Sequence, residues 1–184
     1  MVQGVPSNYD TDLFTPIISY IEEISGHAHG KDSEKDVSIK VIADHSRAAA
    51  FLIGDGILPS NEGRGYVLRR VIRRALRHGR FLGIDKPFLH KTVVAVMESM
   101  QDAYPELMES KSFITKVVLN EEERFTETLD YGLRLLNNEI KRLEELGEKT
   151  IPGDLIFKLY DTYGFPIDII TDLARDKGFD VDHA

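Results

Sequence analysis

Apolar residues recur along most of this chain every three or four positions, which is the spacing of helices with one buried face. Glycine and proline residues separate the periodic segments. The helices that this pattern predicts cover residues 13–25, 38–52, part of 58–80, 86–100, 112–146, 155–160 and 167–177. No region shows the two-residue alternation that is typical of a sheet. We therefore expect an all-α, multihelical fold.

The longest periodic segment, residues 112–146, predicts one long helix. Its apolar stripe is formed by Ile114, Val118, Phe125, Leu129, Leu133, Leu136, Ile140 and Leu143, and many of its other positions are acidic. The charged stretch at residues 31–36 lies outside the periodic segments, and we expect it to be mobile. Because 184 residues is the length of one ordinary domain, we expect a single helical domain over residues 1–184.

The helix within residues 58–80 differs from the others in its charge. Between residues 64 and 80 the chain carries no acid, although its formal net charge is −8. The arginines of this stretch are Arg64, Arg69, Arg70, Arg73, Arg74, Arg77 and Arg80. On a helix the last six fall within an arc of roughly 140°, and the opposite side is filled by Val67, Leu68, Val71, Ile72, Ala75 and Leu76. This pattern predicts a basic amphipathic helix with an apolar side for the core and an outer side of guanidinium groups.

Two interpretations of the arginine side are open from charge alone. Like charges four residues apart disfavour a helix, so an external polyanion could offset their repulsion. The planar guanidinium group also suits the geometry of phosphate. Alternatively, the arginines pair with carboxylates of this acidic chain, and the helix at residues 112–146 is a natural source of such partners.

Composition narrows the classes of function. The chain has no cysteine, which excludes disulfides, thiolate metal sites and a cysteine nucleophile. No apolar run is long enough to cross a bilayer and no signal peptide is visible, so we expect a cytoplasmic protein without membrane association. His27 and His29 have no third ligand nearby, and we interpret Asp44, His45 and Arg47 as a partly buried polar network. We therefore expect no metal site in this chain.

Four segments carry specific sequence strings. They read S-N-Y-D-T-D-L-F at 7–14, V-I-A-D-H-S-R at 41–47, L-P-S-N-E-G-R-G-Y-V-L-R-R at 58–70 and L-Y-D-T-Y-G-F-P at 159–166. In this order they resemble the alanyl-tRNA synthetases, a class II family. In that family the matching region follows the ATP- and alanine-binding domain and precedes the editing domain. The resemblance therefore implies a helical tRNA-recognition domain without catalysis of its own, with ATP, Mg and zinc bound by other domains.

The resemblance also implies partners and contact residues. The partners are the acceptor stem of tRNA(Ala), which that family identifies by a G·U wobble pair, and the other domains of the same synthetase chain. Asn61 and Asp161 match the family's discriminating asparagine and aspartate. Guanine presents an N2 amino group in the minor groove, from which a carboxylate can accept, and the Asn61 amide can donate and accept beside it. The seven arginines would contact the RNA backbone, which positions the stem without specifying it.

Each of these assignments has an alternative. Asn61 could be the N-cap of the basic helix, because asparagine is favoured at that position. Asp161 could be a cap or form an ion pair with Arg73 or Arg74. The whole chain could be a helical spacer or interaction module that makes no direct contact with nucleic acid.

Overall fold

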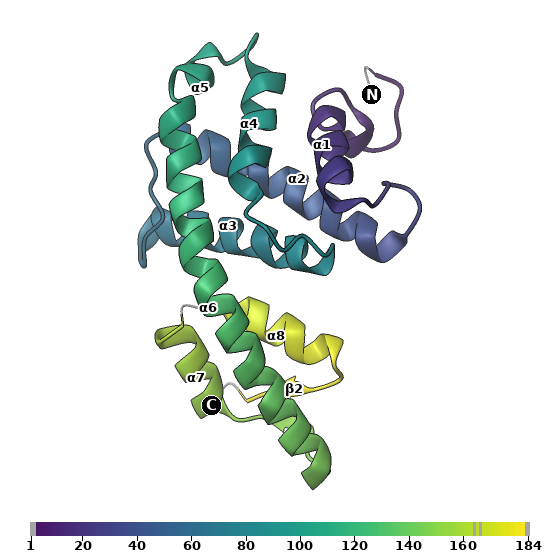
Figure 1. Ribbon diagram of the computed structural model, residues 1–184, viewed down its shortest axis with the longest axis vertical. Coiled ribbons are helices and arrows are strands. Elements are labelled where there is room, and N and C mark those ends of the chain that lie inside the picture. The colour runs from purple at the N-terminus through teal and green to yellow at the C-terminus, as the bar shows by residue number, and fades with distance from the viewer. Residues whose placement is uncertain (1–2, 164, 166, 183–184) are drawn as a thin grey trace. The chain divides into compact units, whose positions relative to one another are not determined.

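The computed structural model describes residues 3–163, 165 and 167–182, and it confirms the predicted all-α, multihelical fold (Figure 1). The elements are η1 (Asn8–Asp10), α1 (Thr15–Ser25), α2 (Ser33–Gly54), α3 (Gly63–Phe81), α4 (Leu89–Met100), α5 (Pro105–Glu109), α6 (Lys111–Leu146), β1 (Thr150–Ile151), α7 (Gly153–Asp161), α8 (Ile167–Asp176) and β2 (Asp180–Val181). Every helix expected from the sequence is present. The short helix α5 and the two-residue strands are additional.

The chain divides into two compact units, Met1–Glu123 and Arg124–Ala184, and α6 contributes residues to both. The single domain over residues 1–184 stays a prediction. In the described parts of both units, no helix combines the length and the apolar composition needed to cross a membrane.

The first unit is built around α2, which contacts α1, α3, α4 and α5. Helices α2 and α3 lie side by side, and α1 also contacts α4 (Figure 1). The largest fully buried side chains of this unit include Ile17, Ile21, Ile39, Ile42, Leu68, Ile72, Leu89 and Met97. These residues belong to the apolar stripes read from the sequence, so the hydrophobic pattern explains how the helices pack.

The last four residues of the charged stretch, 33–36, form the first turn of α2, which begins earlier than the sequence pattern predicted, and the mobility of residues 31–36 stays a prediction. Asp32 is the N-cap of α2, and its Oδ1 accepts hydrogen bonds from the backbone N–H groups of Glu34 at 3.0 Å and Lys35 at 3.3 Å. An aspartate at this position satisfies helix N–H groups that have no partner within the helix. The first turn of α2 therefore depends on its cap and not on buried apolar residues.

The start of α4 is held by a carboxylate from α6. Glu122 is 1% exposed, and its Oε1 accepts from the backbone N–H groups of Phe88 at 2.7 Å and Leu89 at 3.0 Å. Its Oε2 accepts from the backbone N–H of His90 at 3.3 Å and lies 2.9 Å from His90 Nδ1. Phe88 is the N-cap residue but forms no side-chain cap. A distant glutamate thus satisfies the first N–H groups of α4.

The second unit contains the C-terminal part of α6 together with α7, α8 and a parallel pairing of β1 with β2. Phe165 is fully buried, and its backbone N–H donates to the Leu159 carbonyl at 2.9 Å. Gly132 of α6 makes room for this ring, because a Cβ at that position would overlap it. Gly164 and Pro166, which the sequence places at the α7–α8 corner, lie outside the described residues.

Candidate nucleic-acid interface

The arginine side of α3 is largely covered. Arg73 and Arg77 are only 8% and 6% exposed. Arg64 is exposed, and intermediate exposure is found for Arg69, Arg70, Arg74 and Arg80. The predicted outer face of guanidinium groups is therefore wrong for Arg73 and Arg77. Val67, which the sequence pattern assigned to the core, is 55% exposed.

Glu121 of α6 explains why Arg73 can be buried here. Arg73 Nε and Arg73 Nη2 each lie 2.7 Å from Glu121 Oε1, and Arg69 Nε lies 3.2 Å from the same oxygen. Burial lowers the pKa of Arg73, and the charge of Glu121 opposes that shift. A buried cation is tolerated when a hydrogen-bonded carboxylate accompanies it. Pairing with the long acidic helix, which the sequence left open, is confirmed for Arg69 and Arg73.

The other arginines of α3 differ in their surroundings. Arg70 Cζ lies 5.8 Å from the centre of the Tyr66 ring, and Arg80 Nη1 lies 2.8 Å from Asp85 Oδ1. Arg64, in the first turn of α3, is exposed and forms no hydrogen bond or ion pair with any residue that the structure describes. Arg64 is consequently the arginine most accessible to an external anion.

Asn61 lies in the turn that leads into α3, and its side chain is exposed. The N-cap of α3 is Glu62, and no side chain caps the helix, so the alternative that Asn61 is the N-cap is wrong. Instead, Asn61 Oδ1 accepts a hydrogen bond from Arg69 Nη1. The turn itself is closed by the backbone N–H of Ser60, which donates to the Gly65 carbonyl at 3.1 Å. Arg69 therefore fixes the side-chain orientation of Asn61 at the entrance to the basic helix.

Asp161, in the second unit, is the last residue of α7 and is exposed. A carboxylate is disfavoured at this end of a helix, where the partial charge of the backbone is negative. Within the described part of its own unit, Asp161 forms no hydrogen bond or ion pair. Its carboxylate is available there as an acceptor.

The sequence pattern did not single out the two buried glutamates, Glu121 and Glu122, which hold arginines of α3 and the start of α4. Glu121 and Glu122 interrupt the apolar stripe of α6 between Val118 and Phe125, where the helical spacing calls for an apolar residue. They are 3% and 1% exposed. An acidic residue at a position of the apolar stripe could have indicated a buried ion pair, because a buried carboxylate requires partners.

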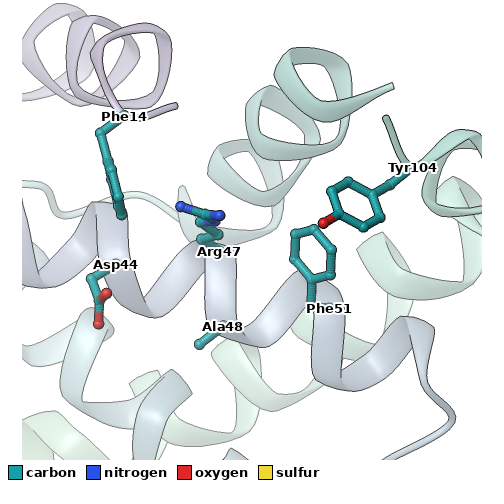
Figure 2. Close-up of a pocket in the computed structure, with 6 residues that line it drawn as sticks. All are labelled: Phe14, Asp44, Arg47, Ala48, Phe51 and Tyr104. Atoms are coloured by element: carbon teal, nitrogen blue, oxygen red, sulfur yellow. The ribbon is translucent and has the colours of Figure 1, made fainter. Parts of the chain in front are cut away.

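A separate pocket of about 400 Å³ lies along α2 in the first unit (Figure 2). It is lined by Phe14, Asp44, Arg47, Ala48, Phe51 and Tyr104. Arg47 Cζ lies 5.1 Å from the centre of the Phe14 ring, and the rings of Phe51 and Tyr104 meet edge to face with centres 4.8 Å apart. The guanidinium–ring contact links α2 to the start of α1.

His45 provides a prediction about pH. Its Nδ1 lies 3.2 Å from Asp44 Oδ2, which confirms part of the expected polar network. Burial lowers the pKa of His45, the hydrogen bond to Asp44 raises it, and the charge of Arg74 lowers it. We expect an NMR titration to give a pKa below the ordinary ~6.5, and Asp44→Asn to lower that pKa further. Because the folded chain favours the neutral ring of His45, protonation of this ring lowers the free energy of unfolding as the pH falls below about 6.5. A pKa above 6.5 would contradict this assignment.

No group of three or more histidine, aspartate or glutamate side chains suited to hold a metal ion occurs among the described residues. The chain has no cysteine that could serve as a thiolate ligand.

Comparison with known proteins gives consistent matches over the whole chain. A family model described as tRNA synthetases class II (A) matches residues 1–184. The chain is similar to proteins named alanine–tRNA ligase from Desulfosudis oleivorans, Lawsonia intracellularis and Geobacillus kaustophilus, with identities of 59%, 60% and 54%. These matches cover 99%, 99% and 100% of this chain but 21% of each relative. The chain therefore spans about a fifth of the length of these curated relatives.

Proposed function

The chain belongs to the family of class II (A) tRNA synthetases, and on that premise we propose that it is the tRNA-recognition part of an alanine–tRNA ligase. In this proposal the chain binds the acceptor stem of tRNA(Ala) in the cytoplasm and reads its G·U wobble pair. Other domains of a longer synthetase attach alanine and bind ATP, Mg and zinc. The chain alone catalyses no reaction.

The observation that carries the proposal is the exposed Asn61 side chain. It is anchored by Arg69 and is not used to cap α3. Discrimination between bases requires donors and acceptors that are held in fixed positions. An exposed amide with a fixed orientation, beside a helix rich in arginine, meets that requirement.

Asp161 supplies the complementary chemistry. The minor groove of an RNA helix is wide and shallow, and guanine presents its N2 amino group there. In a wobble pair this amino group lacks the partner that it has in a G·C pair. The exposed carboxylate of Asp161 can accept a hydrogen bond from it. In the proposal Asn61 and Asp161 are the two residues that read the wobble pair.

The arginines of α3 hold the RNA backbone in this proposal. Arg64 is exposed and would contact phosphate directly, as would the partly exposed Arg69, Arg70, Arg74 and Arg80. Arg73 and Arg77 are buried and would contribute mainly positive charge beneath the surface. Phosphate contacts of this kind position a stem but carry no sequence information.

A second candidate function is a helical spacer or interaction module that makes no contact with nucleic acid. The pairing of Arg69 and Arg73 with Glu121 favours it, because internal ion pairs account for part of the basic charge. The two functions differ in one measurable property. A spacer would not bind an acceptor-stem minihelix with the salt dependence that phosphate contacts produce.

The test compares two minihelices that differ only in a G·U or a G·C pair. The unchanged chain is expected to prefer the G·U stem, and Asp161→Asn is expected to remove about tenfold or more of that preference. The reason is that an amide oxygen without charge accepts more weakly from the guanine amino group. Fluorescence anisotropy at several salt concentrations measures both dissociation constants.

Two matched variants control for nonspecific effects. Asp154→Asn removes an exposed carboxylate from the same helix and is expected to keep the preference. Arg64→Ala is expected to weaken binding to both stems equally and to reduce the salt slope by about one. Equal binding of both stems by the unchanged chain would refute the proposed reading of the wobble pair.

A further inference from the structure

We infer that Glu121 is a positioning residue that acts through Arg69 to fix Asn61 as a hydrogen-bond donor toward RNA, an inference that rests on the proposed function. Glu121 is buried and lies 3.2 Å from Arg69 Nε. The other end of the Arg69 guanidinium donates to Asn61. The Glu121 carboxylate in α6 thereby determines which polar group of the exposed Asn61 side chain faces the RNA.

The orientation of the Asn61 amide follows from the chemistry of its partner. A guanidinium group has five N–H donors and no acceptor, so the Asn61 atom that faces Arg69 must be the carbonyl oxygen. The amide nitrogen of Asn61 forms no hydrogen bond with a described residue. Its two N–H donors are therefore the groups that Asn61 presents to a ligand.

Glu121 restricts the freedom of Arg69. An arginine side chain loses substantial rotamer entropy when it is ordered, so a partner that already holds it reduces the loss on binding. Glu121 is 3% exposed, Arg69 is 18% exposed, and Arg73 bonds the same glutamate oxygen at 2.7 Å. Arg73 thus holds the carboxylate by a hydrogen bond, and the carboxylate holds Arg69 beside it by an ion pair, although Arg69 Nε forms no hydrogen bond.

Asn61 presents a hydrogen-bond donor, and Asp161 presents an acceptor. Pyrimidine O2 and purine N3 are acceptors in the minor groove, and the RNA 2′-hydroxyl can also accept. Guanine N2 is the donor of that groove. Asn61 would accordingly contact an acceptor on the RNA, while Asp161 contacts the guanine amino group.

The experiment measures the ratio of the dissociation constants for the G·C and G·U minihelices, because a purely structural role would not change that ratio selectively. Glu121→Gln is expected to lower the ratio by about tenfold, toward the value of Asn61→Ala. Arg69→Lys keeps the positive charge but loses the planar guanidinium group that contacts both Glu121 and Asn61. This variant should therefore lower the ratio without changing the salt slope. Asn61→Asp keeps an oxygen for Arg69 but has no N–H donor, and it should lower the ratio as well.

Matched controls separate positioning from charge. Glu123→Gln changes the net charge by the same amount at an exposed position of the same helix, and Arg124→Lys makes the same exchange at the next position of that helix, which is also exposed. Both are expected to keep the ratio. Glu121→Gln in an Asn61→Ala background should lower the ratio no further.

The outcomes distinguish failure of the proposed function from failure of the positioning role. No preference in the unchanged chain would reject the proposed function itself. A preference that Glu121→Gln and Arg69→Lys both leave intact, in chains that circular dichroism shows to be folded, would reject the positioning role alone. If Glu121→Gln unfolds the chain, Arg69→Lys decides the question.

Discussion

Glu122→Ala is expected to lower the free energy of unfolding by about 4 kcal/mol, the largest effect of any single substitution considered for this chain. The variant leaves the backbone N–H groups of Phe88, Leu89 and His90 without the carboxylate that accepts from them. Hydrogen bonds to a charged group contribute about 1.5–3 kcal/mol each, and buried N–H groups left without a partner add a desolvation cost. Glu122→Gln keeps one acceptor oxygen and should cost less.

Two measurements test this expectation. Denaturant unfolding followed by circular dichroism gives the change in stability, and amide hydrogen exchange shows whether residues 88–90 lose protection. Glu123→Ala is the matched control, because this neighbouring glutamate is exposed and should stay within about 0.5 kcal/mol of the unchanged chain. If Glu122→Ala behaved like its control, the carboxylate would not be what holds the start of α4.

Gly65→Ala is expected to destabilise the chain by about 2–3 kcal/mol and to abolish the preference for the G·U stem. The backbone of Gly65 adopts no unusual conformation, but a Cβ there would overlap the Leu58 carbonyl oxygen and Ser60 Oγ. Because a backbone carbonyl cannot rotate away as a flexible side chain can, the turn that carries Asn61 has to shift. Asn61 would then lose its alignment with Arg69.

Gly63 provides the contrast within the same turn. Its φ is +56°, and a Cβ there would meet nothing within 4 Å. Gly63→Ala should therefore cost about 1 kcal/mol through backbone strain, and Gly63→Asn less, since asparagine tolerates this conformation. Neither change should displace Asn61. A Gly65→Ala chain that kept both its stability and its stem preference would show that the turn can absorb the Cβ.

The helices were predictable because their apolar stripes are long and regular. Ile17 and Ile21, or Leu68 and Ile72, lie on the buried faces that the spacing assigns to them. The pairing of β1 with β2 was not predictable, because two residues are too few to show an alternating pattern. The first turn of α2 was missed because its signal is a single capping side chain, Asp32, ahead of a polar run.

The sequence named the residues of the candidate site, and their role stays a prediction, but the surroundings of these residues were hidden. A helical projection shows that arginines gather on one side of α3, but it cannot show that α6 covers that side. The burial of Arg73 depends on Glu121, which lies 48 residues away in the chain. The contact between Asn61 and Arg69 was also hidden, since Asn61 lies outside the helix and does not follow its spacing.

The position of the two buried glutamates late in the first unit has a consequence for how the protein is made. The ribosome synthesises the N-terminus first, so α3 and α4 emerge before the carboxylates of Glu121 and Glu122 that bind them. Glu121 is synthesised 48 residues after its partner Arg73, and Glu122 is synthesised 34 residues after Phe88, whose backbone N–H it accepts from. During that interval the arginine side of α3 is an uncovered polycation on a nascent chain. The arginine side of α3 is covered when the first turns of α6 emerge and pack against it.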